Sequence, residues 1–423
     1  MSERSVQNSP AELASTTGAS TTGASTTGAS TTGAPVQVAT VITRLEGGAG
    51  ALAVHGAVAM DPAAFRMTII TGSGDVLADQ ARAAGVEVII EPSLRRPIDP
   101  RSDLAATARL AALFSRRKFD VVHTHTSKAG VVGRVAARRA GVPRIVHTYH
   151  GFPFHQFQSA PRRNAYVATE RRLGRSTDVV LCVGAAVAAE AAGRRIAPPW
   201  RIRAIGVVVD GPAVADATMS ARSASARALA RAALGLPDLP APVVGVVGRL
   251  TMQKAPEDFL AAMAILNRPA AVGVWVGGGE LADRIARLTS RSTGPRVVLA
   301  GERADVLDVL PAFDVFALPS LYEGLPTAVV EAMVCGVPVV ASAVNAVCDL
   351  VIPGETGLLV APRRPDQLAA SIGYLLDYPE VASRMAAAAC ARISGRYTAA
   401  ALRASLTSAY LPGVEASDAV AVR

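Results

Sequence analysis

The sequence has few cysteines and no long apolar run. Its four cysteines form no C-x-x-C pair, so reduced thiols in a cytoplasmic protein are the simplest interpretation. No uncharged apolar run of about 18 residues occurs, which predicts no transmembrane helix. The N-terminus lacks a basic segment followed by an apolar one, which argues against a secretory signal. There is no D-x-D motif and no His/Cys cluster with ligand spacing, so the sequence predicts no metal site.

Acidic residues are scarce in one region. Between Ser93 and Ser176, 17 Lys and Arg stand against 4 Asp and Glu, whereas the whole chain has a formal net charge of +9. Such a stretch suits nucleic acid, anionic lipid or an anionic substrate, and a solvated Arg-rich surface is the open alternative. Aromatic residues make up only 4% of the chain, and no stacking motif interleaves the arginines. These features argue against a nucleic-acid-binding protein.

Length and composition predict a soluble globular protein with two domains. The chain has 423 residues, of which 50% are hydrophobic and 18% charged. Four copies of ASTTG lie near the N-terminus, and small polar repeats cannot bury apolar area. We therefore assign a disordered leader (1–34), an N-terminal domain (35–211), a C-terminal domain (212–395), a helix that crosses back to the N-terminal domain (396–412) and a flexible tail (413–423).

Apolar, β-branched runs alternate with helical stretches in both domains. In the first domain the runs are VQVATVIT, MTIITG, VEVII, FDVVHTH, PRIVHTYHG and DVVLCVG. In the second they are APVVGVVGRL, AVGVWVGGGE, PRVVLAGE, DVFALPS, VPVVAS and TGLLVAP, after a linker that follows IRAIGVVVDG. This alternation predicts two doubly wound α/β domains, each with a parallel sheet covered by helices. Ligands would then bind at the carboxyl ends of the strands, in a cleft between the domains.

Two turns of the second domain carry candidate binding residues. Gly248 ends a strand in VVGRLTMQK, and the cations Arg249 and Lys254 follow it, placed to neutralise a diphosphate. The turn VWVGGGE contains Gly277 and Gly279, which allow close backbone approach to a ligand. Neither turn is specific by itself, and the second lacks the spacing of a dinucleotide-binding motif.

The stretch SLYEGLPTAVVEAMVCG places two carboxylates in apolar surroundings. Glu323 follows the strand DVFALPS, and Pro326 suits the first turn of a helix that ends near Gly336. Glu323 is thus expected beside the positive end of a helix, with Glu331 one turn beyond Thr327. Both carboxylates can then face one cleft. A loop carboxylate and an unrelated surface residue are the alternative.

In this combination the sequence resembles the family 4 retaining glycosyltransferases of GT-B fold. The resemblance covers residues 36–412, and its most specific element is EGLP through Glu331, the family's E-(seven residues)-E signature. GRL with Lys254, VGGGE, AGERADV, PGETGLLV and the closing SGRYTAAALRASLTSAY match in order. The segment from VVHTHTSKAG to HTYHGFPFH is similar to enzymes that build bacterial capsular polysaccharide, exopolysaccharide and lipid-linked glycans.

The resemblance implies roles for individual residues. Glu323 would contact the donor hexose, Glu331 the ribose, and Arg249 and Lys254 the diphosphate. His125, rather than His123, would lie near the reaction centre, although either could be a structural strand-end histidine. Further donor-side positions would be Gly248, Gly277, Gly279, Arg303 (against the nucleobase), Gly324, Leu325 and Thr327. On the acceptor or phosphate side they would be Gly47, Gly48 and His150.

The implied activity is that of a retaining hexosyltransferase that requires no metal and no cofactor. It would move a hexose or N-acetylhexosamine from a nucleotide sugar, by family habit a UDP sugar, to a glycan or polyprenyl-diphosphate-linked acceptor. The expected location is the cytoplasm, with an anionic membrane surface as a candidate partner. A soluble natural-product acceptor and a GT-B-fold nucleotide-sugar epimerase are the alternatives.

Three segments depart from the family pattern, one of them IGVVVD, which replaces a more usual N-G-V-D-like end of the N-terminal domain. Gly50 stands where many members have Glu or Gln, which puts the first loop's acceptor or phosphate contact in doubt. Residues 344–349 replace a G-G-x-x-E-like turn, with Asp349 as a candidate substitute for its acid.

Overall fold

A seven-stranded sheet forms the first half of the chain. The computed structural model describes residues 34–74, 76–95, 97–209, 223–236, 241–291 and 294–413. The strands of the first sheet are β1 (Val36–Ile42), β2 (Phe65–Thr71), β3 (Glu87–Ile90), β4 (Val121–His125), β5 (Arg144–Tyr149), β6 (Val179–Val183) and β7 (Ile202–Ile205). Their order is β3-β2-β1-β4-β5-β6-β7, and every pairing is parallel.

A six-stranded sheet forms the second half. Its strands are β8 (Val243–Val247), β9 (Val272–Val276), β10 (Val297–Gly301), β11 (Val315–Leu318), β12 (Val339–Ser342) and β13 (Leu358–Val360). Their order is β10-β9-β8-β11-β12-β13, again entirely parallel. Both orders are those of doubly wound folds, so the predicted architecture is confirmed.

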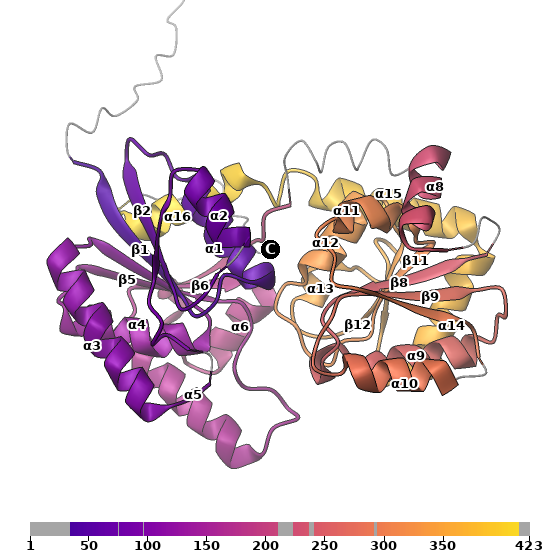
Figure 1. Cartoon of the computed structure of the whole chain (residues 1–423), viewed down its shortest axis with the longest axis horizontal. Helices are drawn as coiled ribbons and strands as arrows, with labels where there is room; N and C mark the ends of the chain where they lie inside the picture. The colour runs from indigo at the N-terminus through magenta and orange to yellow at the C-terminus, as the bar shows by residue number, and fades with distance from the viewer. Residues whose placement is uncertain are drawn as a thin grey trace, which may run out of the picture. The chain divides into compact units, whose positions relative to one another are not determined.

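Helices cover both faces of each sheet (Figure 1). The first half contains α1 (Gly47–Ala59), α2 (Val76–Ala83), α3 (Pro100–Arg117), α4 (Ser127–Arg139), α5 (Ala160–Gly174), α6 (Ala185–Gly193) and the short η1 (Pro199–Arg201). The second contains α8 (Ala224–Ala233), η2 (Met252–Lys254), α9 (Pro256–Leu266), α10 (Ala282–Arg291), α11 (Val306–Val309), η3 (Leu310–Ala312), α12 (Thr327–Val334), α13 (Val347–Leu350), α14 (Pro365–Asp377) and α15 (Pro379–Ile393).

Local sequence explains where the elements begin and end. The strands β8, β9 and β11 are buried along their whole length, and parallel sheets covered on both faces favour such continuous valine-rich runs. The long helix α3 begins where Asp99 caps the Arg101 N–H, with Pro100 in its first turn. It ends at Lys118, which has a left-handed backbone (φ 51°).

The last helix returns to the first sheet. This helix is α16 (Ala399–Tyr410), which begins where Thr398 caps the Ala401 N–H and packs on α1 (Figure 1). Its Tyr410 hydroxyl lies 2.8 Å from Nδ1 of His123 on β4, and the Ala409 carbonyl accepts from Arg144. The domain boundary that we place near residue 212 lies outside the described residues, as do nearly all of the leader and tail.

Candidate active site

Each sheet reverses its strand order once, at β1–β4 and at β8–β11. In open parallel sheets, ligands bind at the carboxyl ends of the strands beside such a reversal. Most predicted site residues follow these four strands. Gly47 and Gly48 come after β1, His125 ends β4, the segment 248–254 follows β8, and Glu323 follows β11. The fold therefore gathers them at the edges where a ligand is expected.

An ion pair joins the loops after β8 and β11. Lys254 Nζ lies 2.5 Å from Glu323 Oε1, and Gln253 Nε2 donates to the other carboxylate oxygen at 3.3 Å. The two loops meet because β8 and β11 are neighbours in the sheet. Glu323 is only 8% exposed, so water screens the pair weakly. Arg249 is exposed and forms no ion pair within the described part of the chain, which leaves a second cation for an anionic ligand.

The glycine turn after β9 packs on the chain's own backbone. Gly277 has φ 133°, and a Cβ there would lie 2.2 Å from the Gly248 carbonyl oxygen. Gly279 has φ 147°, and its Cβ would lie 2.5 Å from the Leu250 carbonyl oxygen. Our prediction gave these glycines close approach to a ligand. The structure gives them a structural reason, because only glycine lets the turn rest on the loop after β8.

The loop after β5 lies against the loop that carries Glu323. A Cβ on Gly324 would lie 1.9 Å from the His150 carbonyl oxygen and 3.4 Å from the Gly151 nitrogen. The rings of His155 and Tyr322 are stacked, with centroids 4.2 Å apart and planes inclined by 8°. The candidate acceptor-side and donor-side loops are therefore in direct contact.

The start of α12 faces the turn after β1. Thr327 Oγ1 lies 3.2 Å from the position that a Cβ of Gly48 would take, while Gly47 has a left-handed backbone with open space beside it. Leu325 is buried in the hydrophobic core. Pro326 is the N-cap of α12 rather than its first helical residue, so the predicted helix start was one residue early.

Glu331 lies partly buried on the second turn of α12. Its carboxylate has no hydrogen-bond partner among the described residues, and burial raises its pKa to about 7. A partly buried acceptor without a donor is suited to bind ligand hydroxyls. This environment differs from the plain surface position that the sequence left open.

The raised pKa of Glu331 predicts a pH-dependent effect of Glu331→Gln. The folded-state pKa of about 7 exceeds the ordinary value of 4.5, so ionisation destabilises the fold as pH rises through this range. We expect Glu331→Gln to stabilise the fold by about 1 kcal/mol at pH 5 and by about 3 kcal/mol at pH 8, both without nucleotide. Thermal unfolding at both pH values measures this. The exposed Glu355→Gln is the control, and a Glu331→Gln difference that does not change with pH would contradict the prediction.

Four histidines lie on or directly after β4 and β5, and burial lowers the pKa of each, so they are neutral: His123, His125, His147 and His150. His125 Nδ1 lies 2.9 Å from His150 Nε2, so these two predicted residues form a hydrogen-bonded pair. Burial and the neighbouring histidines hold the pKa of His125 well below its usual range, and burial lowers that of His150 to about 4. Both ring nitrogens of His123 are occupied, by Tyr410 and Thr148, which gives it a structural role. His125 is only 3% exposed, and its place near the reaction centre stays a prediction.

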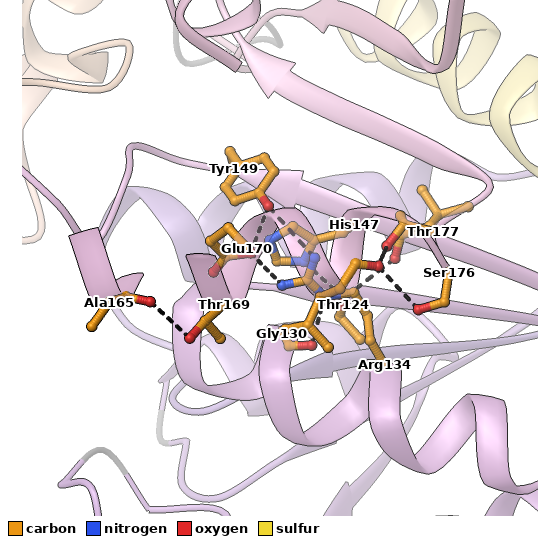
Figure 2. Close-up of polar contacts among 12 residues, drawn as sticks. Thr124, Gly130, Arg134, His147, Tyr149, Ala165, Thr169, Glu170, Ser176 and Thr177 are labelled. Carbon is orange, nitrogen blue, oxygen red and sulfur yellow. Dashed lines mark hydrogen bonds and ion pairs between the residues drawn. The ribbon is translucent and has the colours of Figure 1, made fainter. Parts of the chain in front are cut away.

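A fully buried ion pair stands behind this edge of the first sheet (Figure 2). Arg134 on α4 donates to Glu170 on α5 at 2.6 Å, and the Tyr149 hydroxyl donates to the same carboxylate oxygen at 2.6 Å. Arg134 also donates to the Gly130 carbonyl. These bonds hold α4 and α5 against the end of β5, immediately before His150. Arg134 is therefore removed from the basic surface that the sequence predicted.

Arg303 is held on the loop after β10. Its guanidinium forms two bonds to Asp305, at 2.8 and 2.5 Å, and donates to the Ala233 carbonyl at 3.2 Å. A guanidinium fixed in this way offers a flat face on which a base can stack. Its contact with a nucleobase stays a prediction.

Two polar residues after β12 form contacts that the sequence did not predict, and one of them reaches the Glu323 loop. Asn345 Oδ1 accepts the Glu323 N–H at 3.2 Å, and its backbone is left-handed with φ 41°. Asp349 Oδ2 accepts the Ala186 N–H at the start of α6, at 2.9 Å. The sequence marked this segment as a departure from the family pattern with Asp349 as a candidate substitute for its acid, and that role stays a prediction. An asparagine in a loop gave no further signal.

Neither a metal site nor a membrane span is found among the described residues. No group of three or more His, Cys, Asp and Glu side chains is arranged there to hold a metal ion. No helix of the described chain combines the length and apolar character needed to cross a bilayer.

Solved structures share this architecture. The crystal structure of Anabaena HepE in complex with UDP and glucose aligns with a TM-score of 0.73 and 21% identity, covering 88% of this chain and 98% of that one. Sucrose-phosphate synthase from Thermosynechococcus elongatus aligns with a TM-score of 0.75 and 23% identity, covering 89% and 98%. These likenesses support the GT-B fold.

Sequence comparison shows the family. Residues 241–378 match the family described as glycosyl transferases group 1, and residues 46–210 match glycosyltransferase family 4. The UDP-Gal:alpha-D-GlcNAc-diphosphoundecaprenol alpha-1,3-galactosyltransferase of Escherichia coli is 35% identical over 277 residues, which are 64% of this chain and 68% of the relative. The D-inositol 3-phosphate glycosyltransferase of Thermobispora bispora is 30% identical over 334 residues, covering 74% and 75%. This chain therefore belongs to the family 4, group 1 glycosyltransferases of GT-B fold.

Proposed function

We propose that the protein is a retaining glycosyltransferase that moves a hexose or N-acetylhexosamine from a UDP sugar to a lipid-diphosphate-linked glycan. The observation that carries this proposal is the Lys254–Glu323 pair, together with Glu331 on the second turn of α12, whose carboxylate has no hydrogen-bond partner among the residues that the structure describes. Glu323 would bind hexose hydroxyls, and Glu331 would accept from the ribose. The N-terminus of α12 lies between them, where backbone N–H groups favour phosphate.

The relatives support the choice of donor and acceptor. The Escherichia coli relative is named for a UDP-Gal donor and a GlcNAc-diphosphoundecaprenol acceptor. A second candidate is a soluble phosphorylated acceptor, favoured by the several D-inositol 3-phosphate glycosyltransferases that are about 30% identical. Both acceptors are anionic, which suits the basic first half of this chain.

The site supports a reaction on one face of the sugar. The bond from the anomeric carbon to the β-phosphate oxygen breaks, and the electron pair stays on the phosphate. Arg249, Lys254 and the start of α12 would stabilise that charge. The acceptor oxygen attacks from the same face and forms the new bond, while its proton passes to the leaving phosphate oxygen. Trapping a glycosyl adduct on Glu323 would contradict this one-step, same-face reaction.

A screen of nucleotide sugars tests the proposed function. Each candidate is scored for nucleotide release and for thermal stabilisation of the protein, with and without a chelator. We expect a UDP sugar to stabilise the fold and to release UDP, with no loss of activity in the chelator. Failure of every nucleotide sugar in both assays would overturn the proposal. A change of the sugar without a glycosylated product would instead identify an epimerase.

The exposed residues at the start of α3 suggest contact with a membrane. Ile98 and Leu104 are 74% and 63% exposed, and the exposed cations Arg95 and Arg101 lie beside them in sequence. Apolar side chains among cations are typical of proteins that rest on an anionic bilayer. An enzyme that uses a lipid-linked acceptor would need such a surface.

Neutralising three exposed arginines should weaken binding to anionic vesicles. We expect the triple change Arg95→Gln, Arg101→Gln, Arg116→Gln to lower affinity by about 1 kcal/mol per arginine, or roughly 100-fold in total. Co-sedimentation with anionic and neutral vesicles at two salt concentrations measures this. The matched control neutralises three exposed arginines of the second half, Arg287, Arg291 and Arg296. Equal binding of wild type to neutral vesicles would refute membrane attraction by charge.

A further inference from the structure

Asn345 connects the Glu323 loop to the first sheet's helix α6. Its Oδ1 accepts the Glu323 N–H at 3.2 Å, and its Nδ2 donates to Glu190 Oε2 at 3.3 Å. The partners fix the orientation of the amide, because one offers only a donor and the other only acceptors. Few residues other than glycine tolerate the left-handed backbone at this position, and asparagine is one of them.

Glu190, which Asn345 contacts, is linked in turn to the loop after β5. Glu190 Oε1 accepts from Arg194 Nε at 2.8 Å, one turn along α6. The Arg194 guanidinium lies over the Phe154 ring, 4.7 Å from its centroid. Phe154 belongs to the segment that follows His150, on the candidate acceptor side. A continuous set of contacts therefore runs from the acceptor-side loop, through Glu190 and Asn345, to the backbone of Glu323.

A second contact with α6 offers an internal comparison. Asp349 Oδ2 accepts the Ala186 N–H at 2.9 Å, and a Cβ on Gly184 would lie 2.7 Å from that oxygen. This contact joins the same two segments of the chain. It does not touch Glu323. Removing it would therefore weaken the packing of the segments without removing a hydrogen bond of the Glu323 loop.

We propose that Asn345 is a positioning residue that sets Glu323 relative to the acceptor-side loop through Glu190. This inference rests on the proposed function. The Lys254 pair fixes the Glu323 side chain, whereas Asn345 fixes its backbone against the half of the molecule that would hold the acceptor. Small displacements of a positioned group lower turnover more than ground-state binding.

The main test variant is Asn345→Gly, because glycine keeps the left-handed backbone while the side chain that carries the amide is removed. We expect kcat for the UDP sugar found in the screen to fall about tenfold, with KM within about twofold of wild type. Glu190→Ala should give the same split. The double variant should be no worse than Asn345→Gly alone, because both changes break one bridge.

Asp349→Ala is the matched comparison. It should lower the unfolding temperature at least as much as Asn345→Gly, with a smaller effect on kcat. A kcat of Asn345→Gly within twofold of wild type, an equal loss in Asp349→Ala, or multiplying losses in the double variant would each overturn the inference. A wild-type protein without turnover would instead overturn the proposed function, so the two failures are distinguishable.

Discussion

Replacing Glu323 with glutamine should lower kcat by about two to three orders of magnitude. The amide keeps the size of the side chain and can still accept from Lys254, so the fold should survive. It loses the charge that strengthens the hydrogen bonds to hexose hydroxyls as the bond to phosphate breaks. Steady-state kinetics with the active UDP sugar measure the loss, and the unfolding temperature confirms that the variant is folded.

Glu257→Gln is the control for this experiment. Glu257 pairs with Arg284 at 3.2 Å on an exposed face, so the change removes the same charge away from the site. We expect its kcat to match wild type, since exposed ion pairs contribute little. Full activity in Glu323→Gln, or in the shorter Glu323→Ala, would remove Glu323 from the site.

Replacing Gly324 with alanine should abolish most activity, by about 100-fold or more. The new Cβ would lie 1.9 Å from the His150 carbonyl oxygen, and neither partner is a flexible side chain. One of the two loops must therefore move, which displaces Glu323 on one side or the His125–His150 pair on the other. Kinetics, together with the affinity for UDP alone, would separate loss of geometry from loss of nucleotide binding.

Gly193→Ala is the matched glycine control. Gly193 ends α6, and a Cβ there meets nothing within 4 Å. Activity and unfolding temperature should both stay at wild-type values. If Gly324→Ala is as active as Gly193→Ala, the close contact between the loops after β5 and β11 is not required for function.

The sequence predicted the strands and the edges at which the site lies. Valine-rich runs buried on both faces and ending in glycine or polar residues identify parallel strands, and doubly wound topology then gives their carboxyl ends. Glu323 and Lys254 were placed at these edges in this way, whereas His125 was singled out only by the resemblance to the family. Burial of the Arg134–Glu170 pair was not predicted, because a count of charges does not show which arginine a neighbouring helix covers.

Contacts between side chains that are far apart in the sequence were not predicted. The Lys254–Glu323 pair depends on β8 and β11 being neighbours, and the residues are 69 positions apart. Asn345 meets Glu190 across 155 positions, and no local pattern marks either residue. The raised pKa of Glu331 likewise comes from its surroundings in the folded protein. Such features follow from tertiary packing, which a single sequence does not specify residue by residue.

Calorimetric titration of UDP and of the active UDP sugar tests the divided roles of the two carboxylates most directly. Wild type, Glu323→Gln and Glu331→Gln are compared at pH 8, where Glu331 is ionised. We expect Glu331→Gln to weaken both ligands by the same factor, about tenfold. We expect Glu323→Gln to leave the affinity for UDP unchanged and to remove the additional affinity that the sugar gives the UDP sugar. If Glu323→Gln weakened UDP as much as the UDP sugar, Glu323 would not be the residue that holds the hexose.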